Sequence, residues 1–225
     1  QQKVEDKSNE ISAIPDLIDV LDLEDSIVSI DAIGCQTEIA DKIIEAKADY
    51  LLAVKLNQGN LYEHVSDDFL WNSCEVDNKT WEYGHGRYET RTCQVVDATK
   101  FLPAVLLNKW RNIKTVVKIM SQRVIAEVTS SQTRYYISSQ AKEPMFYNTA
   151  VREHWSIENH LHWHLDVTFS EDKSRSRTKN APQNLNILRK MALHRISSMD
   201  DKLSLKKRRY RASMNTLYLQ NVLGL

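Results

Sequence analysis

Two short apolar runs with a helical stretch between them constrain the fold of this chain more than any other feature. The first run contains Ile27, Val28 and Ile30 and is nearly continuous, and the second covers residues 50–55. Continuous apolar runs of this length are typical of strands that are covered on both faces. The stretch between them begins at a candidate N-cap, Thr37, and repeats isoleucine at helical spacing. Strand, helix and strand in this order predict a right-handed parallel crossover in an α/β sheet.

Polar side chains follow both predicted strands. Asp31 comes at the C-terminal end of the first strand, and Lys55, Asn57 and Gln58 lie at the corresponding end of the second. In open α/β sheets, ligands bind at the carboxyl ends of the strands. We therefore predict that Asp31 belongs to a functional site and that the three residues after the second strand contact the same ligand.

Charged and β-favouring residues alternate between residues 81 and 139. Arg87, Glu89 and Arg91, for example, are separated by tyrosine and threonine. This period of two predicts three or four antiparallel strands that form an inserted sheet. One face of this sheet could present Arg87 and Arg91 to phosphate groups. Alternating charges are more often the solvated face of a strand, and the spacing leaves both interpretations open.

A second carboxylate of interest, Glu158, lies in the predicted long helix within residues 151–179. On a helix with about 100° per residue, Ile157, Leu161 and Leu165 form one apolar stripe. Glu158 lies about 60° from the centre of that stripe. A glutamate at the edge of a buried face needs a cation, hydrogen bonds or a metal ion to compensate for lost hydration. The helix pattern alone favours an ordinary salt bridge and leaves a metal site as the alternative.

The charge is unevenly distributed, although the whole chain is neutral. Residues 1–68 contain 16 acidic and 5 basic side chains. Basic clusters follow later, one with Lys173, Arg175 and Arg177 and another at residues 206–211. This asymmetry favours a polyanionic partner, or acidic and basic surfaces that pack against each other. We predict phosphate contacts for the first cluster and a basic linker at the second, before a last short helix.

Composition and cysteine usage are those of a globular protein in a reducing compartment. The 225 residues are 42% hydrophobic and 27% charged, and no apolar run is long enough to span a bilayer. Cys35, Cys74 and Cys93 show neither CxxC nor zinc-finger spacing, which predicts free thiols. The first residues show no signal-peptide pattern, so we expect a cytoplasmic protein that does not enter a membrane.

Several spaced motifs carry a family resemblance. They are SIDAIGCQ at residues 29–36, KLNQ at 55–58, HGRYETR at 85–91 and HWSIEN at 154–159, followed by LHW at 161–163 and LDV at 165–167. In these motifs the chain closely resembles the H-repeat-associated insertion-sequence transposases, which belong to the DDE transposases with a ribonuclease H-like core. The resemblance covers essentially the whole chain.

The resemblance implies a fold and a division of the chain. The fold is α/β, a ribonuclease H-like mixed sheet with flanking helices that is interrupted by an inserted antiparallel β-sheet. Residues 1–70 would form the first part of the core, residues 71–145 the inserted β region, and residues 146–225 the second part of the core with the C-terminal helices. The family's motif for the first core strand, which resembles Ile-Asp-Gly-Lys, is absent from the sequence. We therefore expect an N-terminally truncated chain with a bare sheet edge, which predicts either a homodimer through that edge or a missing part that is supplied elsewhere.

The implied activity is cut-and-paste DNA transposition in the bacterial cytoplasm. Three carboxylates of such enzymes bind two Mg²⁺ or Mn²⁺ ions, which promote DNA strand hydrolysis and strand transfer. By motif match, Asp31 is the second of these carboxylates and Glu158 the third, and without the first we expect the chain to be inactive alone. The partners are insertion-sequence ends and target DNA. The residues expected to contact DNA are Lys55, Asn57, Gln58, Arg87, Arg91, His154, His162, Lys173, Arg175 and Arg177.

Two alternatives remain open on the sequence. His154, Glu158 and His162 recur at i, i+4 and i+8, and imidazole with carboxylate suits zinc. They extend over about 12 Å of helix, too far to share one ion, and no HExxH motif accompanies them. The second alternative is a non-catalytic transposase remnant that binds DNA or another protein. Both this remnant and an active enzyme predict salt-sensitive DNA binding, whereas only the enzyme predicts Mn²⁺-dependent nicking.

Overall fold

The computed structural model describes residues 10–71, 77–84 and 86–225, which form two compact units. Unit 1 comprises residues 1–154 and unit 2 residues 155–225, and each is described by itself. The helices that begin in unit 1 are α1 (Glu10–Asp19), α2 (Thr37–Glu45), α3 (Gly59–Trp71), α4 (Ala98–Phe101), α5 (Ala104–Lys109) and α6 (Pro144–Ile157). Its strands are β1 (Ile27–Ile30), β2 (Asp49–Val54), β3 (Asp77–Gly84), β4 (Arg87–Asp97), β5 (Thr115–Ile125) and β6 (Val128–Ser138).

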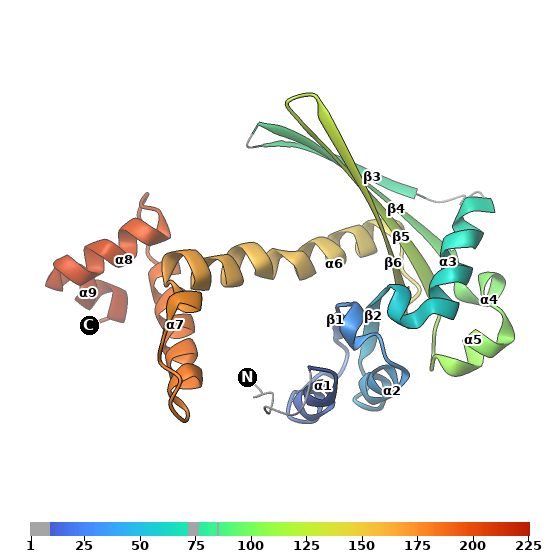
Figure 1. The fold of residues 1–225 in the computed structure, drawn as a ribbon, viewed down its shortest axis with the longest axis horizontal. Coiled ribbons are helices and arrows are strands. Elements are labelled where there is room, and N and C mark those ends of the chain that lie inside the picture. Colours follow the sequence, from blue (N-terminus) through green and yellow to red (C-terminus); the bar gives the residue numbers. More distant parts are fainter. Residues whose placement is uncertain (1–9, 72–76, 85) are drawn as a thin grey trace. The chain divides into compact units, whose positions relative to one another are not determined.

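One mixed sheet contains all six described strands, in the order β1-β2-β6-β5-β4-β3 (Figure 1). β1 and β2 run parallel with helix α2 between them in the chain, which confirms the predicted crossover. β6 lies antiparallel to β2, with Leu52 opposite Ile137, and the remaining neighbours are antiparallel as well. The mixed α/β fold class is therefore confirmed and is consistent with a ribonuclease H-like fold. The four antiparallel strands extend the sheet of β1 and β2 directly.

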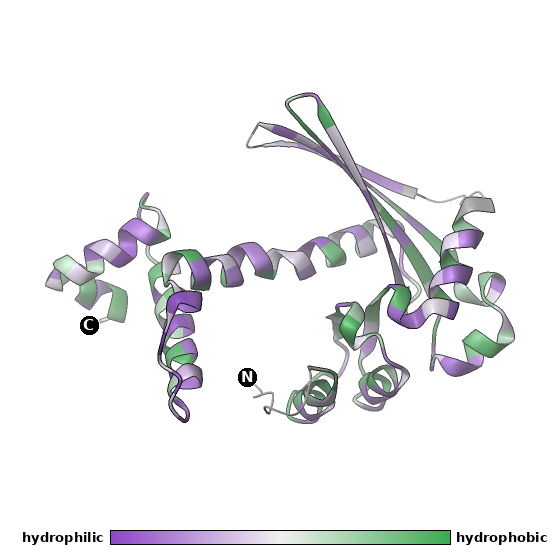
Figure 2. Cartoon of the chain, in the orientation of Figure 1, coloured by the Kyte–Doolittle hydropathy of each residue, from purple (hydrophilic) through white to green (hydrophobic). Residues whose placement is uncertain are grey.

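β2 is buried along its whole length from Tyr50 to Val54, as a strand covered on both faces should be. On one face, Tyr50, Leu52 and Val54 join a core cluster with apolar residues of α2, α3 and the segment after α5. α6 lies on the other face of the sheet. Ser29 of β1 is paired with Leu51 of β2, so both side chains point to this other face, and Ser29 contacts His154 of α6. Figure 2 shows hydrophobic colouring on the strands and also on stretches of α1, α2 and α5. β1, in contrast, is only half-buried, and it is an edge strand of the sheet among the described residues.

Unit 2 consists of short helical segments around a small core. It contains two π-helical segments, η3 (Glu158–His162) and η4 (His164–Thr168), the 3₁₀ turn η5 (Glu171–Lys173), and three helices, α7 (Ala181–Ser197), α8 (Leu205–Met214) and α9 (Thr216–Leu223). Ile196, Tyr218 and Val222 form its buried centre. In the described ranges of both units, no helix combines the length and the apolar character that crossing a membrane requires.

The predicted basic linker at residues 206–211 is wrong, because these residues form most of α8. Ser204 caps the helix by accepting a hydrogen bond from the backbone of Lys207, at 3.4 Å. Arg208 donates to the Asp201 carboxylate at 2.7 Å and to the carbonyl of Ile196 at 2.9 Å, so it joins α8 to the end of α7. The sequence suggested a linker because α8 is mostly hydrophilic, as Figure 2 shows, and offers little apolar periodicity.

A polar network stabilises the contact between α8 and α9. The hydroxyl of Tyr218 donates to Asp201 at 2.6 Å, and the same carboxylate accepts from Arg208. The hydrogen bond from Tyr218 and, to a smaller extent, the cation of Arg208 hold the pKa of Asp201 below its usual value. Two of the basic side chains expected in a linker, Arg208 and Arg209, therefore have structural roles, since Arg209 also donates to the carbonyl of Thr168.

Candidate active site

Asp31 follows β1 at the C-terminal end of the strand, and Lys55 follows β2 at the same edge of the sheet (Figure 1). The side chain of Asp31 is 52% exposed, so its carboxylate is accessible to a ligand. The carbonyl of Asp31 accepts a hydrogen bond from Gly34 at 2.9 Å, which closes a 3₁₀ turn directly after the strand. A Cβ atom on Gly34 would lie 2.4 Å from the Cγ2 atom of Ile30. Glycine is therefore required for the turn to fold back onto β1.

Asn57 and Gln58 brace the loop that carries Asp31. The amide of Asn57 donates to the carbonyl of Ala32 at 2.6 Å, and the amide of Gln58 donates to the carbonyl of Cys35 at 2.9 Å. The parallel neighbours β1 and β2 bring these two loops together, as predicted. These amide donors are used within the protein, while Lys55 is exposed beside them. DNA contact by these three residues stays a prediction.

His154 from α6 lies next to Asp31. Its Nε2 atom is 3.3 Å from Oδ1 of Asp31, and its Nδ1 atom is 2.9 Å from Oγ of Ser29. The sequence predicted His154 as a DNA contact and gave no indication of its proximity to Asp31. Ser29 was not predicted at all, although its position two residues before Asp31 places both side chains on one face of the strand.

Glu158 belongs to unit 2, where it begins the π-helical segment η3 and is exposed. The predicted position of Glu158 at the edge of a buried face is wrong. The α-helix ends at Ile157, whose side chain is 47% exposed, and the following hydrogen bonds span five residues, so a period of 100° no longer describes the faces. Leu165 is buried as expected. π-helical segments are rare and are often found at functional sites.

The residues of unit 2 that were predicted to contact DNA are exposed. His162 lies in η3, and Lys173, Arg175 and Arg177 lie in and after η5, where the backbone leaves helical conformation. All four side chains are accessible to a polyanion. Their role in binding DNA stays a prediction.

Arg87 and Arg91 surround Glu89 on β4. The nearest guanidinium nitrogens lie 2.6 Å from the carboxylate for Arg91 and 3.7 Å for both Arg87 and Arg123. Burial raises the pKa of Glu89, but the hydrogen bond from Arg91 and the three cations outweigh it and lower the pKa overall. The sequence missed Arg123, which stands directly opposite Glu89 on β5 and could have been found only from the strand register.

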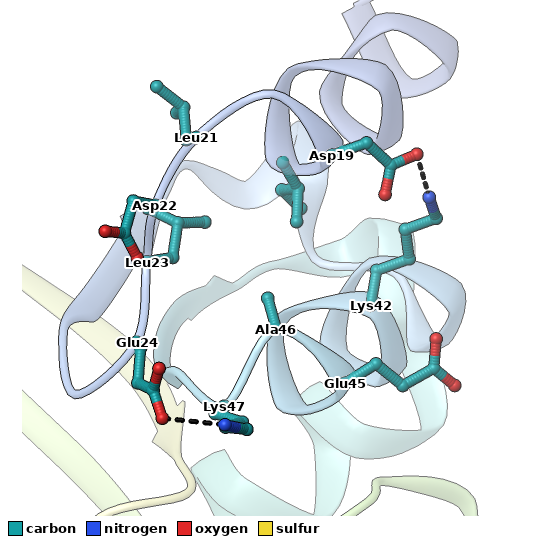
Figure 3. A pocket seen from close by; sticks show the side chains of 10 residues that line it. Asp19, Leu21, Asp22, Leu23, Glu24, Lys42, Glu45, Ala46 and Lys47 are labelled. Carbon is teal, nitrogen blue, oxygen red and sulfur yellow. Dashed lines mark hydrogen bonds and ion pairs between the residues drawn. The ribbon is translucent and has the colours of Figure 1, made fainter.

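Two hollows of the described residues carry charged side chains. One, of about 340 Å³, lies between the segment after α1 and the C-terminal half of α2, and its opposite charges are paired as Asp19 with Lys42 and Glu24 with Lys47 (Figure 3). The second, of about 220 Å³, is lined by Glu89, Arg123 and neighbouring serine and glutamine side chains of β5 and β6. Neither of these two hollows is lined by Asp31.

Neither zinc chemistry nor a reactive thiol finds support in the described ranges. No group of three His, Cys, Asp or Glu side chains is gathered there in a way that could hold a metal ion. Cys35 and Cys93 are free, as predicted. Both are buried, and burial raises the pKa of each thiol to about 12. Such thiols are protonated at neutral pH and are poor nucleophiles. The prediction for Cys74 lies outside the described residues.

Comparison with known proteins supplies the family context. The model of the family described as "Transposase DDE domain" matches residues 1–194. The chain is 41% identical over 233 residues to "Putative transposase YncI" of Escherichia coli O157:H7, covering 100% of this chain and 59% of that protein. It is 37% identical over 238 residues to "H repeat-associated putative transposase YhhI" of Escherichia coli K12, covering 100% of this chain and 61% of that protein. The chain thus spans about three fifths of the length of these curated relatives.

Proposed function

Because this chain belongs to the transposase DDE domain family, we propose that it takes part in cut-and-paste DNA transposition by metal-dependent phosphoryl transfer. The observation that carries the proposal is the accessible carboxylate of Asp31 at the C-terminal end of a strand, within the motif at residues 29–36 that resembles those of the family. Ligand sites of open α/β sheets lie at this edge. A protein that acts on bacterial DNA works in the cytoplasm, which is the location we propose.

Asp31 and Glu158 are the residues proposed to hold Mg²⁺ or Mn²⁺. Both are exposed carboxylates, and hard divalent cations of this kind prefer carboxylate oxygens and water as ligands. The neighbour of Asp31 at 3.3 Å is an imidazole, which leaves most of the oxygen lone pairs available. When bound, the metal ions would activate the attacking hydroxyl or water and stabilise the leaving oxygen.

The basic side chains are proposed to bind DNA. Lys55 follows β2 at the same end of the sheet as Asp31, is exposed, and can neutralise a phosphate bound at this end. The exposed cations of Arg175 and Arg177 can contact the backbone in the same sequence-independent way. Phosphate neutralisation releases counterions, so affinity should fall steeply as salt is added.

The effect of replacing Glu89 with glutamine tests the role of Arg87 and Arg91. Removing the carboxylate frees both cations and Arg123 from their partner, so DNA affinity at low salt should rise roughly threefold to tenfold and the salt dependence should steepen by about one phosphate contact. Fluorescence anisotropy over a salt series measures both. Glu63→Gln, an equal charge change on the exposed face of α3, is the control. An equal rise in both variants would show a general charge effect and contradict a phosphate-binding role.

A non-catalytic transposase remnant is the second candidate. The two candidates differ in their response to metal. Slow plasmid nicking that requires Mn²⁺ and stops in chelator supports the catalytic proposal, whereas DNA binding without nicking at any Mn²⁺ concentration supports the remnant.

We also propose a homodimer through β1. This strand pairs with β2 and, among the described residues, has no strand on its other side. Its residues are only half-buried, and an unpaired edge is a template for another strand. A monomer in light scattering at all concentrations would contradict this part of the proposal.

A further inference from the structure

We infer that His154 is a positioning residue for Asp31, and that Ser29 stabilises the tautomer of His154 that this role requires. The inference rests on the proposed function, because it concerns how Asp31 is held for a metal ion. The three side chains form one hydrogen-bonded series. Oγ of Ser29 lies 2.9 Å from Nδ1 of His154, and Nε2 of the same ring lies 3.3 Å from Oδ1 of Asp31.

The backbone brings the three groups together from two elements. Ser29 and Asp31 are two residues apart along an extended segment, so their side chains project from the same face of the sheet. α6 packs on that face and places His154 over them. The imidazole is largely covered, with 22% of its side chain exposed, whereas 52% of the Asp31 side chain is exposed. The covered ring can therefore restrict a carboxylate that would otherwise move freely.

The chemistry of the acceptors determines the tautomer. An ionised carboxylate only accepts hydrogen bonds, so the nitrogen that faces Asp31 must carry a proton. In the neutral ring the other nitrogen, Nδ1, is then an acceptor, and the hydroxyl of Ser29 donates to it. The opposite tautomer would set a nitrogen lone pair against the carboxylate. Ser29 thus favours the tautomer in which His154 donates to Asp31.

The arrangement orients one oxygen of Asp31 and leaves the other for a cation. A carboxylate has about four lone-pair sites, and His154 occupies one of them on Oδ1. Groups that hold a metal ligand in place typically contribute tenfold to a hundredfold to metal affinity. We therefore expect His154 to raise the affinity of Asp31 for Mn²⁺ by roughly tenfold.

The test is a double-mutant cycle on Mn²⁺ affinity, measured from the electron paramagnetic resonance signal of free Mn²⁺. His154→Ala should weaken binding roughly tenfold, and His154→Gln, whose amide can reach a similar donor position, should restore most of it. In an Asp31→Asn background, His154→Ala should have no further effect. His64→Ala, which changes an exposed histidine on α3, is the matched control and should leave the affinity unchanged.

The outcomes separate this inference from the proposed function. If Asp31→Asn lowers Mn²⁺ affinity but His154→Ala does not, the positioning role is overturned and the metal site stands. An equal loss from His154→Ala with and without the Asp31 carboxylate would show a merely structural role and also overturn the inference. Mn²⁺ affinity that does not respond to Asp31→Asn overturns the proposed metal site, and the positioning role with it.

A metal-free measurement remains decisive if a variant fails to fold. Nitrogen-15 spectra of the seven histidines at about pH 8, where an ordinary imidazole is neutral, report the tautomer of each ring. The His154 resonance, assigned by its loss in His154→Gln, should show protonated Nε2 and bare Nδ1. Ser29→Ala should shift the tautomer ratio toward protonated Nδ1. A wild-type ring protonated on Nδ1 would overturn the inference.

Discussion

Replacing Glu158 with glutamine is expected to abolish the slow Mn²⁺-dependent DNA nicking that the catalytic proposal predicts, with a loss of at least about a hundredfold in rate. The amide has almost the same shape as the carboxylate but carries no charge, so it is a much weaker ligand for a hard divalent cation. Glu158 is exposed in η3, so the substitution should leave the fold intact. Relaxation of a supercoiled plasmid, followed over time in Mn²⁺ and in chelator, measures the rate.

Glu143→Gln is the matched control for this experiment. Glu143 is an exposed glutamate immediately before α6, and the substitution removes the same charge from the same chain. Its nicking rate should stay within about twofold of the wild type, and DNA binding should be the same in both variants. Nicking that persists in Glu158→Gln would show that this glutamate is not a metal ligand. A loss in both variants would point to charge rather than coordination.

Replacing Trp110 with alanine should reduce the free energy of unfolding of unit 1 by about 3–5 kcal/mol. The side chain of Trp110 is fully buried at the end of α5, within the core cluster formed by β2, α2 and α3. Truncation removes its apolar contacts and leaves a cavity that a packed sheet cannot readily close. The neighbouring carbonyl of Arg111 accepts from Tyr50 at 2.9 Å, which further restricts collapse of this segment. Urea unfolding followed by circular dichroism measures the change.

Trp81→Ala provides the comparison within the same sheet. Trp81 lies on β3 and is 78% exposed, so the same truncation should cost less than about 1 kcal/mol. Similar losses for the two variants would contradict the assignment of Trp110 to the core. At temperatures where both variants remain folded, we expect Trp110→Ala and Trp81→Ala to show the same nicking rate and the same DNA affinity.

The local patterns predicted the parallel part of the fold well. The apolar run at residues 27–30 and the run at residues 50–55 are both strands, and the order strand, helix, strand gave their parallel pairing. The run of β2 is continuous because this strand is covered on both faces, whereas β1 is only half-buried. The sequence could not show that β6 would pair with β2, because such a contact depends on register between distant strands.

The sequence predicted the position of site residues that directly follow a strand. It did not predict which residue of a helix packs against them. Asp31 and Lys55 were placed at one edge by the direction of β1 and β2 alone. His154 meets Asp31 because of how α6 packs across the sheet, and no periodicity in the sequence encodes that approach. The expectation for Glu158 failed because it assumed α-helical geometry beyond Ile157, where the hydrogen-bonding pattern changes.

The pairing of β2 with β6 has a consequence for how the chain acquires its structure during synthesis. β3 with β4, and β5 with β6, are joined by short connections and can form as soon as they are made, whereas Leu51 must pair with Ser138 far along the chain. β2 therefore leaves the ribosome before its second neighbour has been translated. Its apolar side chains stay open to incorrect association during that interval, so a newly made chain should depend on the rate of translation and on chaperones that shield such segments.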